Sequence, residues 1–291
     1  MNLKQGKNIT YGKSMGYEAW QNFIRNKMGM AGLVILLLLI LAAIFADVIA
    51  PYGFDDQSLI RRLKPPSGDF WFGTDNLGRD IFSRVIIGSR YSLIIGLSAA
   101  TLSCVAGTVL GAIAGFYNEI ADNIIMRALD LLLAIPGVLL AISIIAVLGN
   151  GVQNVVFAVA IATVPQYART VRASVLSIKE LEYIEASTCI GSSKIRTLFR
   201  HVLPNCMAPI IVTMSLSVSG AILAASSLSF IGLGIQPPTP EWGAMLAAGR
   251  PYIRDAWWVI TFPGLAIMTV IFALNMLGDA LRDVLDPRLK Q

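Results

Sequence analysis

Long apolar runs separated by short polar segments dominate this sequence. The first run, AGLVILLLLILAAIFADVIA at residues 31–50, is long enough to cross a bilayer as one helix. Helices suit such runs because lipid offers no partner to backbone N–H and C=O groups. This run lacks a small-residue cleavage site, so we expect a true span rather than a removed signal peptide. The predicted spans are residues 30–50, 88–116, 121–148, 151–172, 206–234 and 257–281. The pattern therefore predicts an all-α integral membrane protein with six transmembrane helices.

The polar segments between these runs predict how the chain is divided. We expect a cytoplasmic or interfacial arm at 1–29, a first transmembrane helix at 30–50, an external polar excursion at 51–87, a five-helix core at 88–281 with a cytoplasmic loop at 177–204, and a cytoplasmic tail at 282–291. Most of the 23 Lys and Arg residues fall in segments that lie inside if the N-terminus is inside. The charge pattern therefore favours an N-in, C-in topology. The stretch YEAWQNFIRNK within the arm predicts an amphipathic helix in contact with lipid.

Several predicted spans contain prolines or polar residues at depth. Prolines can kink a transmembrane helix where neighbours satisfy the freed carbonyls, which fits either gating or static packing. Polar residues inside the membrane are costly and are candidates for a transport pathway. Our candidate pathway and gating residues are Asp130, Pro136, Pro165, Ser226 and Asn275.

Each of these candidates has a simpler structural interpretation. Asp130 could pair with Arg127 one turn earlier on the same helix. The residues Asp279, Arg282 and Asp283 fit an interfacial charge cluster. The small-residue run SAATLSCVAGTVLGAIAG predicts that its helix packs closely against a neighbour.

The loop at 177–204 is polar but compatible with helices. We expect one helix over 177–189, a bend at Gly191, and a second helix from 192 that stops near Pro204. Four residues give the second helix an apolar stripe: Ile195, Leu198, Phe199 and Val202. A helix pair of this kind outside the membrane is either a solvated loop resting on headgroups or a docking element for a cytoplasmic protein.

Two external segments carry the remaining candidate residues. In GTDNLGRD, the side chains of Asp75, Arg79 and Asp80 could either order the excursion by local ion pairs or face a solute receptor. In QPPTPEWG, the prolines predict a constrained turn, and Trp242 fits either an interfacial aromatic or a lid anchor. We treat these four residues as candidates for receptor contact.

Composition narrows the class of protein further. Hydrophobic residues make up 55% of the chain and charged residues 14%, about half the charged share of a soluble domain. The net charge of +5 fits basic residues on the inner side of a membrane rather than nucleic-acid binding. The three cysteines lack metal-ligand spacing, so we expect small core residues, no disulfide framework and no metal site. No HExxH or GxSxG pattern occurs and the only histidine is His201, so we expect no catalytic residues and no enzyme.

Four stretches resemble a known family. The residues Glu185, Ala186, Ser187, Gly191, Leu203 and Pro204 are similar to the EAA signature of permease subunits in ATP-binding-cassette importers. The family's usual second alanine is Ser187 here, and its usual isoleucine is His201. Three further stretches, beginning FGTDNLGRD, LSFIGLGIQPP and WWVITFPGL, resemble the second permease subunit of peptide and nickel importers. The resemblance covers nearly the whole chain.

This resemblance implies a type I importer fold in a bacterial cytoplasmic membrane and a set of partners. The partners would be a second homologous permease, two cytoplasmic ATPases and an extracytoplasmic solute-binding protein. The chain has no G-x-x-x-x-G-K-[ST] loop, so ATP and Mg²⁺ would bind the partner subunits and this chain would hold no cofactor. The signature residues would then couple this chain to an ATPase. A peptide substrate is expected, with nickel or a metallophore complex as the alternative. An ion-coupled secondary transporter is a further alternative from another class.

Overall fold

The computed structural model describes residues 15–285, and helices dominate that range. The described residues contain one isolated bridge, between Thr74 and Asp80, and no strand. The first half of the chain forms α1 (Met15–Arg25), α2 (Lys27–Ile44), α3 (Ala46–Ile49), η1 (Leu59–Arg61), α4 (Ile81–Phe116), α5 (Glu119–Leu133) and α6 (Gly137–Leu148). The second half forms α7 (Val152–Lys179), α8 (Glu182–Cys189), α9 (Lys194–Thr197), η2 (Leu198–Val202), η3 (Leu203–Cys206), α10 (Met207–Phe230), α11 (Trp242–Gly249), η4 (Arg250–Tyr252) and α12 (Trp258–Leu285).

Four of these helical segments are long and apolar enough to cross a membrane. They are α2, α4, the continuous helical run 194–230 that ends with α10, and α12, and the bent pair α5–α6 would make a fifth span. The predicted fourth span corresponds to α7, whose 28 residues are long enough but include Gln153, Asn154, Gln166, Arg169 and Arg172. The structure thus supports a multi-pass helical fold. By length and composition, four or five of its helical segments qualify as spans, compared with the six predicted.

The predicted third span is sharply broken. α5 and α6 meet at an angle of 89°, and the break lies at residues 134–136. Pro136 precedes the first residue of α6, where its missing N–H leaves no intrahelical bond unmade. The interruption predicted at Pro136 and Gly137 is confirmed, but the two helices do not form one continuous rod. At Pro165 the helix is not interrupted, because α7 continues through this residue as a single helix.

Close packing of α4 on α7 forms the centre of the bundle. Gly107, Gly111 and Gly115 recur every fourth residue of α4, and a Cβ at any of them would press into the backbone or Cβ atoms of α7. At Gly107 the obstacle is Tyr167, and at Gly111 it is the backbone of Ala168. The small-residue run therefore permits the close approach that the sequence predicted.

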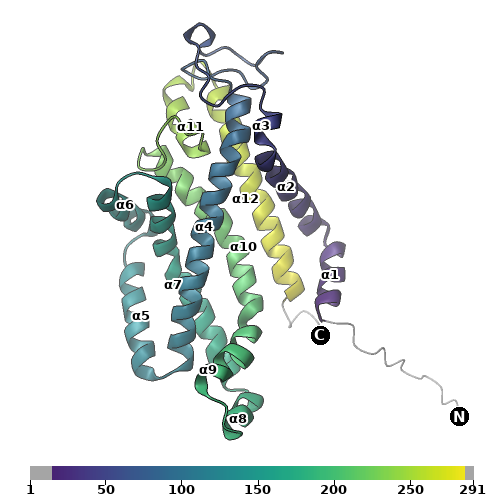
Figure 1. The fold of residues 1–291 in the computed structure, drawn as a ribbon, viewed down its shortest axis with the longest axis vertical. Helices are drawn as coiled ribbons and strands as arrows, with labels where there is room; N and C mark the ends of the chain where they lie inside the picture. The colour runs from purple at the N-terminus through teal and green to yellow at the C-terminus, as the bar shows by residue number, and fades with distance from the viewer. Residues whose placement is uncertain (1–14, 286–291) are drawn as a thin grey trace, which may run out of the picture.

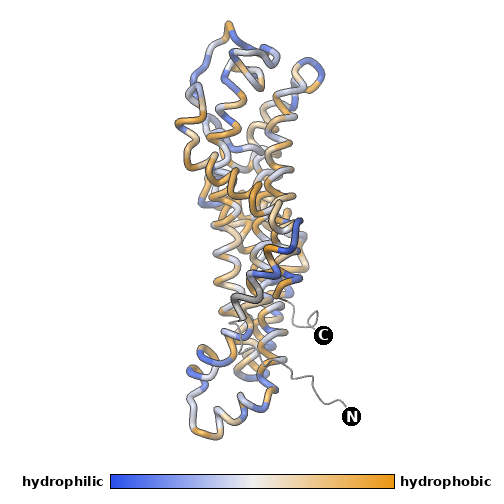
Figure 2. Tube along the Cα trace, turned by 90° about the vertical axis from the view of Figure 1, so that its right-hand side faces the viewer, coloured by the Kyte–Doolittle hydropathy of each residue, from blue (hydrophilic) through white to orange (hydrophobic). Residues whose placement is uncertain are grey.

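The ends of the bundle are polar and its middle is apolar, as Figure 2 shows. The segment 50–80 and α11 lie at one end, whereas α8 and α9 lie at the other (Figure 1). The C-terminal end of α12 and the helix α1 lie toward the α8–α9 end (Figure 1). α1 packs against α12 through the buried ring of Phe23. This arrangement agrees with the predicted topology for the described residues; residues 1–14 of the arm and 286–291 of the tail lie outside them.

Candidate functional site

The helix α8 is a short helix at the end of the bundle opposite α11 (Figure 1). Its sequence EYIEASTC places Glu182 and Glu185 in the first turn, where carboxylates interact favourably with the helix dipole. The predicted helix over 177–189 is interrupted at Glu180 and Leu181, because α7 ends at Lys179 and α8 begins at Glu182. α8 is therefore a separate element, only about 12 Å long.

Gly191 ends α8 with the bend that the sequence predicted. Its φ is +89°, and the N–H groups of Gly191 and Ser192 donate to the carbonyls of Thr188 (3.0 Å) and Ser187 (3.1 Å). This is the hydrogen-bonding pattern of a helix that closes with a left-handed residue. A Cβ at Gly191 would meet no atom within 4 Å, so any substitution there strains the backbone without causing a clash.

The second helix of the loop does not stop at Pro204. It runs from Lys194 through a π-helical turn, η2, and a 3₁₀ turn, η3, directly into α10. Pro204 sits in the first turn of η3, where its lack of an N–H is tolerated. The prediction of a stop near Pro204 is therefore wrong, and the loop and the following transmembrane helix form one continuous rod.

Three buried side chains pack α8 against the helical run 194–230. Ile184 of α8 is 3% exposed and lies in one apolar cluster with Leu198, Val202 and residues of α4, α7 and α10. The amide nitrogen of Asn205 donates to the hydroxyl of Tyr183 (3.2 Å) and to the carbonyl of His201 (2.6 Å). Both packing and hydrogen bonding therefore join α8 to the start of α10.

The outer surface of the loop remains uncovered in this chain. Ile190 is 88% exposed, and further large apolar side chains are exposed beside it at Leu181, Tyr183, Ile195 and Phe199. The predicted apolar stripe therefore divides, since Leu198 and Val202 enter the core while Ile195 and Phe199 face outward. Of the six signature residues, four are exposed (Glu185, Ala186, Gly191 and Pro204) and two are partly buried (Ser187 and Leu203). Exposed apolar residues gathered at a polar end are typical of a protein-binding surface.

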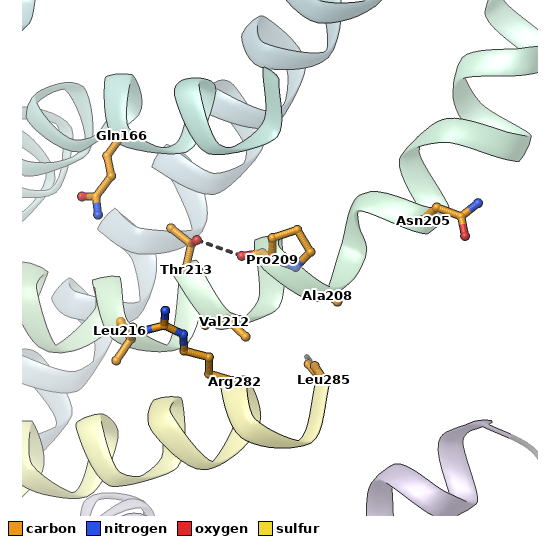
Figure 3. A pocket seen from close by; sticks show the side chains of 9 residues that line it. All are labelled: Gln166, Asn205, Ala208, Pro209, Val212, Thr213, Leu216, Arg282 and Leu285. Carbon is orange, nitrogen blue, oxygen red and sulfur yellow. Dashed lines mark hydrogen bonds between the residues drawn. The ribbon is translucent and has the colours of Figure 1, made fainter. Parts of the chain in front are cut away.

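A cavity of about 480 Å³ opens farther along the same end, between α7, α10 and α12 (Figure 3). Its lining combines apolar residues of α10 with Gln166 of α7 and Arg282 of α12. None of the predicted pathway residues lines it. Gln166 was missed because a single glutamine in an apolar run carries no motif, although its place directly after Pro165 could have drawn attention to it.

The predicted pathway residues lie on different elements. Ser226 is buried and donates to the carboxylate of Glu241 (3.3 Å), and it also borders an apolar hollow of about 390 Å³ between α10 and α12. The amide oxygen of Asn275 accepts a hydrogen bond from Ser219 across α10 and α12 (2.9 Å). Pro136 and Pro165 lie at the α5–α6 break and within α7. The structure brings no two of the five together as one site.

Asp130 pairs with a different arginine from the one expected. Its carboxylate lies 2.6 Å from Arg169 of α7, rather than pairing with Arg127 on its own helix. About two turns earlier on α5 and one turn later on α7, Asp122 and Arg172 make a bidentate pair at 2.5 and 2.6 Å. These contacts could not be predicted from the sequence, because they depend on how α5 lies along α7. Together they hold the first half of the bent pair against the bundle.

The GTDNLGRD segment is folded onto the chain itself. Asp75 is buried, and its carboxylate accepts from the backbone N–H groups of Leu77 and Arg79 and from the guanidinium of Arg79 at 2.7 Å. Asp80 caps α4 by accepting from Ser83 (2.7 Å), and burial raises the pKa of its carboxyl group. Of the two interpretations, the structure supports local ordering: these side chains have no exposed surface to offer a receptor.

Trp242 is also internal. It is 1% exposed, and its indole N–H donates to the carbonyl of Val85 (2.9 Å). The preceding Glu241, which we did not single out, is equally buried and caps α11 by accepting from the N–H groups of Gly243 and Ala244. Trp242 thus anchors α11 to α4 within the bundle, and its assignment to a receptor-facing surface is corrected. An acidic residue directly before a helix start was the signal that could have identified Glu241.

The cysteines only partly match expectation. Cys206 is buried and Cys104 half-buried, but Cys189 at the end of α8 is exposed. Cys189 was wrongly predicted as a core residue, because α8 projects from the bundle. Among the described residues, no group of three or more His, Cys, Asp or Glu side chains is placed to hold a metal ion.

Comparison with known proteins identifies the type of chain. Residues 107–291, more than half of the sequence, match the family model described as binding-protein-dependent transport system inner membrane component. The chain belongs to this family. Residues 14–66 match a second model, the N-terminal transmembrane domain of oligopeptide transport permease C. The protein is therefore a multi-pass permease subunit of the inner membrane, which settles the choice against an ion-coupled secondary transporter.

Several curated relatives align along almost the full length. A di/tripeptide transport system permease protein of Pseudomonas aeruginosa is 49% identical over 279 residues, covering 94% of this chain and 92% of its own. A dipeptide permease protein of Alkalihalophilus pseudofirmus is 46% identical, with coverage of 94% and 90%. A glutathione permease protein of Pectobacterium atrosepticum is also 46% identical, with coverage of 94% and 91%.

The fold has a solved counterpart. An inward-facing methionine ABC transporter structure aligns with a TM-score of 0.58 at 16% identity, covering 69% of this chain and 96% of that one. At this identity the match concerns the fold alone, and it supports the type I importer permease architecture.

Proposed function

We propose that this chain forms half of the membrane channel of an ATP-driven importer of short peptides. The observation that carries the proposal is the similarity along nearly the whole chain to permeases named for di- and tripeptides, dipeptides and glutathione. A second permease subunit forms the other half, and an extracytoplasmic binding protein delivers the peptide. The chain itself performs no chemistry and holds no cofactor.

The energy enters through α8. Two ATPase subunits bind ATP and Mg²⁺ on the cytoplasmic side, and one of them covers the exposed apolar residues around Ile190. Glu185, Ala186 and Gly191 lie on the part of the loop that this ATPase contacts. When the ATPases close, α8 moves, and its attachment through Ile184 and Tyr183 carries the motion into the rod that becomes α10.

Uptake of a labelled dipeptide into ATP-loaded proteoliposomes containing the whole transporter tests the substrate and the energy source together. Uptake should require ATP and the binding protein, and should persist when ion gradients are collapsed. Uptake of nickel or a chelated metal instead of dipeptide would show that the chain belongs to a nickel or metallophore importer.

Glu185→Lys tests the coupling role. We expect uptake to fall at least tenfold while the subunit still inserts and assembles, because the reversed charge faces the ATPase rather than the chain's own core. Glu180→Lys is the matched control, since it makes the same charge change at an exposed position just before α8. Equal uptake by both variants would remove Glu185 from the coupling surface.

A further inference from the structure

Two polar side chains of the cavity between α7, α10 and α12 have no partner among residues 15–285. Other polar groups in its lining are already bonded: Thr213 donates to the carbonyl of Pro209 (2.8 Å), and Asn205 is bonded to Tyr183 and His201. Within residues 15–285, the amide of Gln166 and the guanidinium of Arg282 make no hydrogen bond or ion pair. Figure 3 shows Arg282 reaching from α12 toward α10, and Gln166 extending from α7 toward the same space.

Among residues 15–285, no acidic side chain pairs with Arg282. Asp279 and Asp283 lie within one turn on α12, but neither is within ion-pair distance of its guanidinium. No acidic residue lines the cavity, and the remaining lining includes Ala208, Val212 and Leu216. The site therefore presents one exposed positive charge beside a largely apolar lining, and this charge would attract an anion.

The position of Gln166 argues that this surface is not exposed to lipid. It lies in the middle of α7 and its side chain is exposed on the chain. A polar side chain at such a place is costly against acyl chains, so residues of this kind face protein or a water-filled path.

We infer that Arg282 and Gln166 bind the C-terminal carboxylate of a short peptide in the cytoplasmic half of the transport path. This inference rests on the proposed function. A guanidinium presents paired N–H donors that match the two oxygens of a carboxylate, and a glutamine amide can donate to the same group or accept from a peptide N–H. The apolar lining accommodates differing side chains without selecting among them, so the site recognises the one group that all such peptides share.

Protection of an introduced cysteine tests the inference on the complete transporter. Ala208→Cys places a thiol in the lining, and Cys189→Ser removes the exposed native thiol. Maleimide labelling of Cys at 208 is followed in nucleotide-free proteoliposomes with dialanine or dialanine amide on the cytoplasmic side. Dialanine should slow the labelling, and the amide should need about tenfold higher concentration for the same effect, the loss expected for one charge-assisted hydrogen bond.

Three variants locate the effect. Arg282→Gln should abolish the difference between dialanine and its amide, whereas Arg282→Lys, which keeps the charge, should preserve part of it. Asp279→Asn is the matched control: it changes a charge one turn away on α12 but outside the cavity lining, and should leave protection unchanged.

Other outcomes overturn the inference. Equal protection by dialanine and its amide, or undiminished protection in Arg282→Gln, would show that the carboxylate is not recognised here. Labelling that depends on the content of anionic lipid and not on peptide would assign Arg282 to a lipid headgroup. Dialanine uptake into matched vesicles that are loaded with ATP and supplied with the binding protein separates the two proposals. Uptake without protection rejects only this site, whereas absence of ATP-dependent uptake rejects the proposed function.

Discussion

At the scale of the residue, Gly191 combines an unusual conformation with an open environment. Its φ of +89° is reached at little cost only by glycine, yet no atom lies within 4 Å of where a Cβ would be. A substitution there changes the direction in which the chain leaves α8 without disturbing the packed core.

We predict that Gly191→Ala destabilises the turn by about 1–2 kcal/mol, the cost of a Cβ in this conformation. The subunit should insert and assemble normally, while ATP hydrolysis by the transporter continues with little uptake. The ratio of peptide transported to ATP hydrolysed measures this directly.

Gly149→Ala is the control for that experiment. Gly149 has a φ of +84° and equally open surroundings, but it lies between α6 and α7, away from the loop. If both variants lower the transport ratio alike, the effect is general strain and not a property of the coupling turn.

At the scale of the element, the α4–α7 contact decides whether the bundle closes. Three glycines on one face of α4 let the two helices approach until backbone and Cβ atoms touch. The ion pairs Asp122–Arg172 and Asp130–Arg169 hold α5 along α7, and apolar residues of α4, α5 and α7 share one cluster. α7 is therefore held by both α4 and α5, although Gln166 and Arg169 stay exposed.

We predict that Gly111→Ala destabilises the subunit by about 1–3 kcal/mol, because the added methyl group collides with the backbone of Ala168. The apparent melting temperature of the detergent-solubilised transporter should fall. Gly264→Ala within α12 makes the same change where the nearest atom is an ordinary 3.9 Å away, and it should leave the melting temperature unchanged. Equal melting of the two variants would contradict the tight contact.

At the scale of the whole molecule, polar ends and an apolar middle fix the chain in the bilayer (Figure 2). The loop with α8 lies at one end and the cap built from GTDNLGRD at the other (Figure 1). The cap holds Asp75, Arg79 and Asp80 in buried polar contacts, but Ile60 and Trp71 beside them are exposed, as Ile190 is in the loop. Both ends therefore leave large apolar side chains uncovered in this chain.

We predict that Cys189 reacts with a membrane-impermeant maleimide in inside-out vesicles but not in intact spheroplasts. A cysteine placed at Gly68, which is exposed in the external segment, should show the opposite behaviour. The buried Cys206 should react in neither preparation. Labelling of Cys189 from outside would reverse the topology.

Within the assembled transporter, Cys189 should react more slowly than in the isolated subunit, because the proposed ATPase contact would cover the loop. Unchanged reactivity would place the ATPase elsewhere on the cytoplasmic face.

The sequence by itself determined the features that depend on local composition and conformational preference. Apolar length required membrane helices, Gly191 required a left-handed turn, Pro136 required an interruption, and the EAA-like residues pointed to the permease family. Only the tertiary structure decided which polar groups meet. Asp130 pairs with Arg169, Trp242 lies in the core, and Gln166 and Arg282 line the same cavity. Such contacts join residues far apart in the chain. They depend on how each helix is rotated about its axis and shifted along its neighbour, and the periodicity of one helix does not specify this.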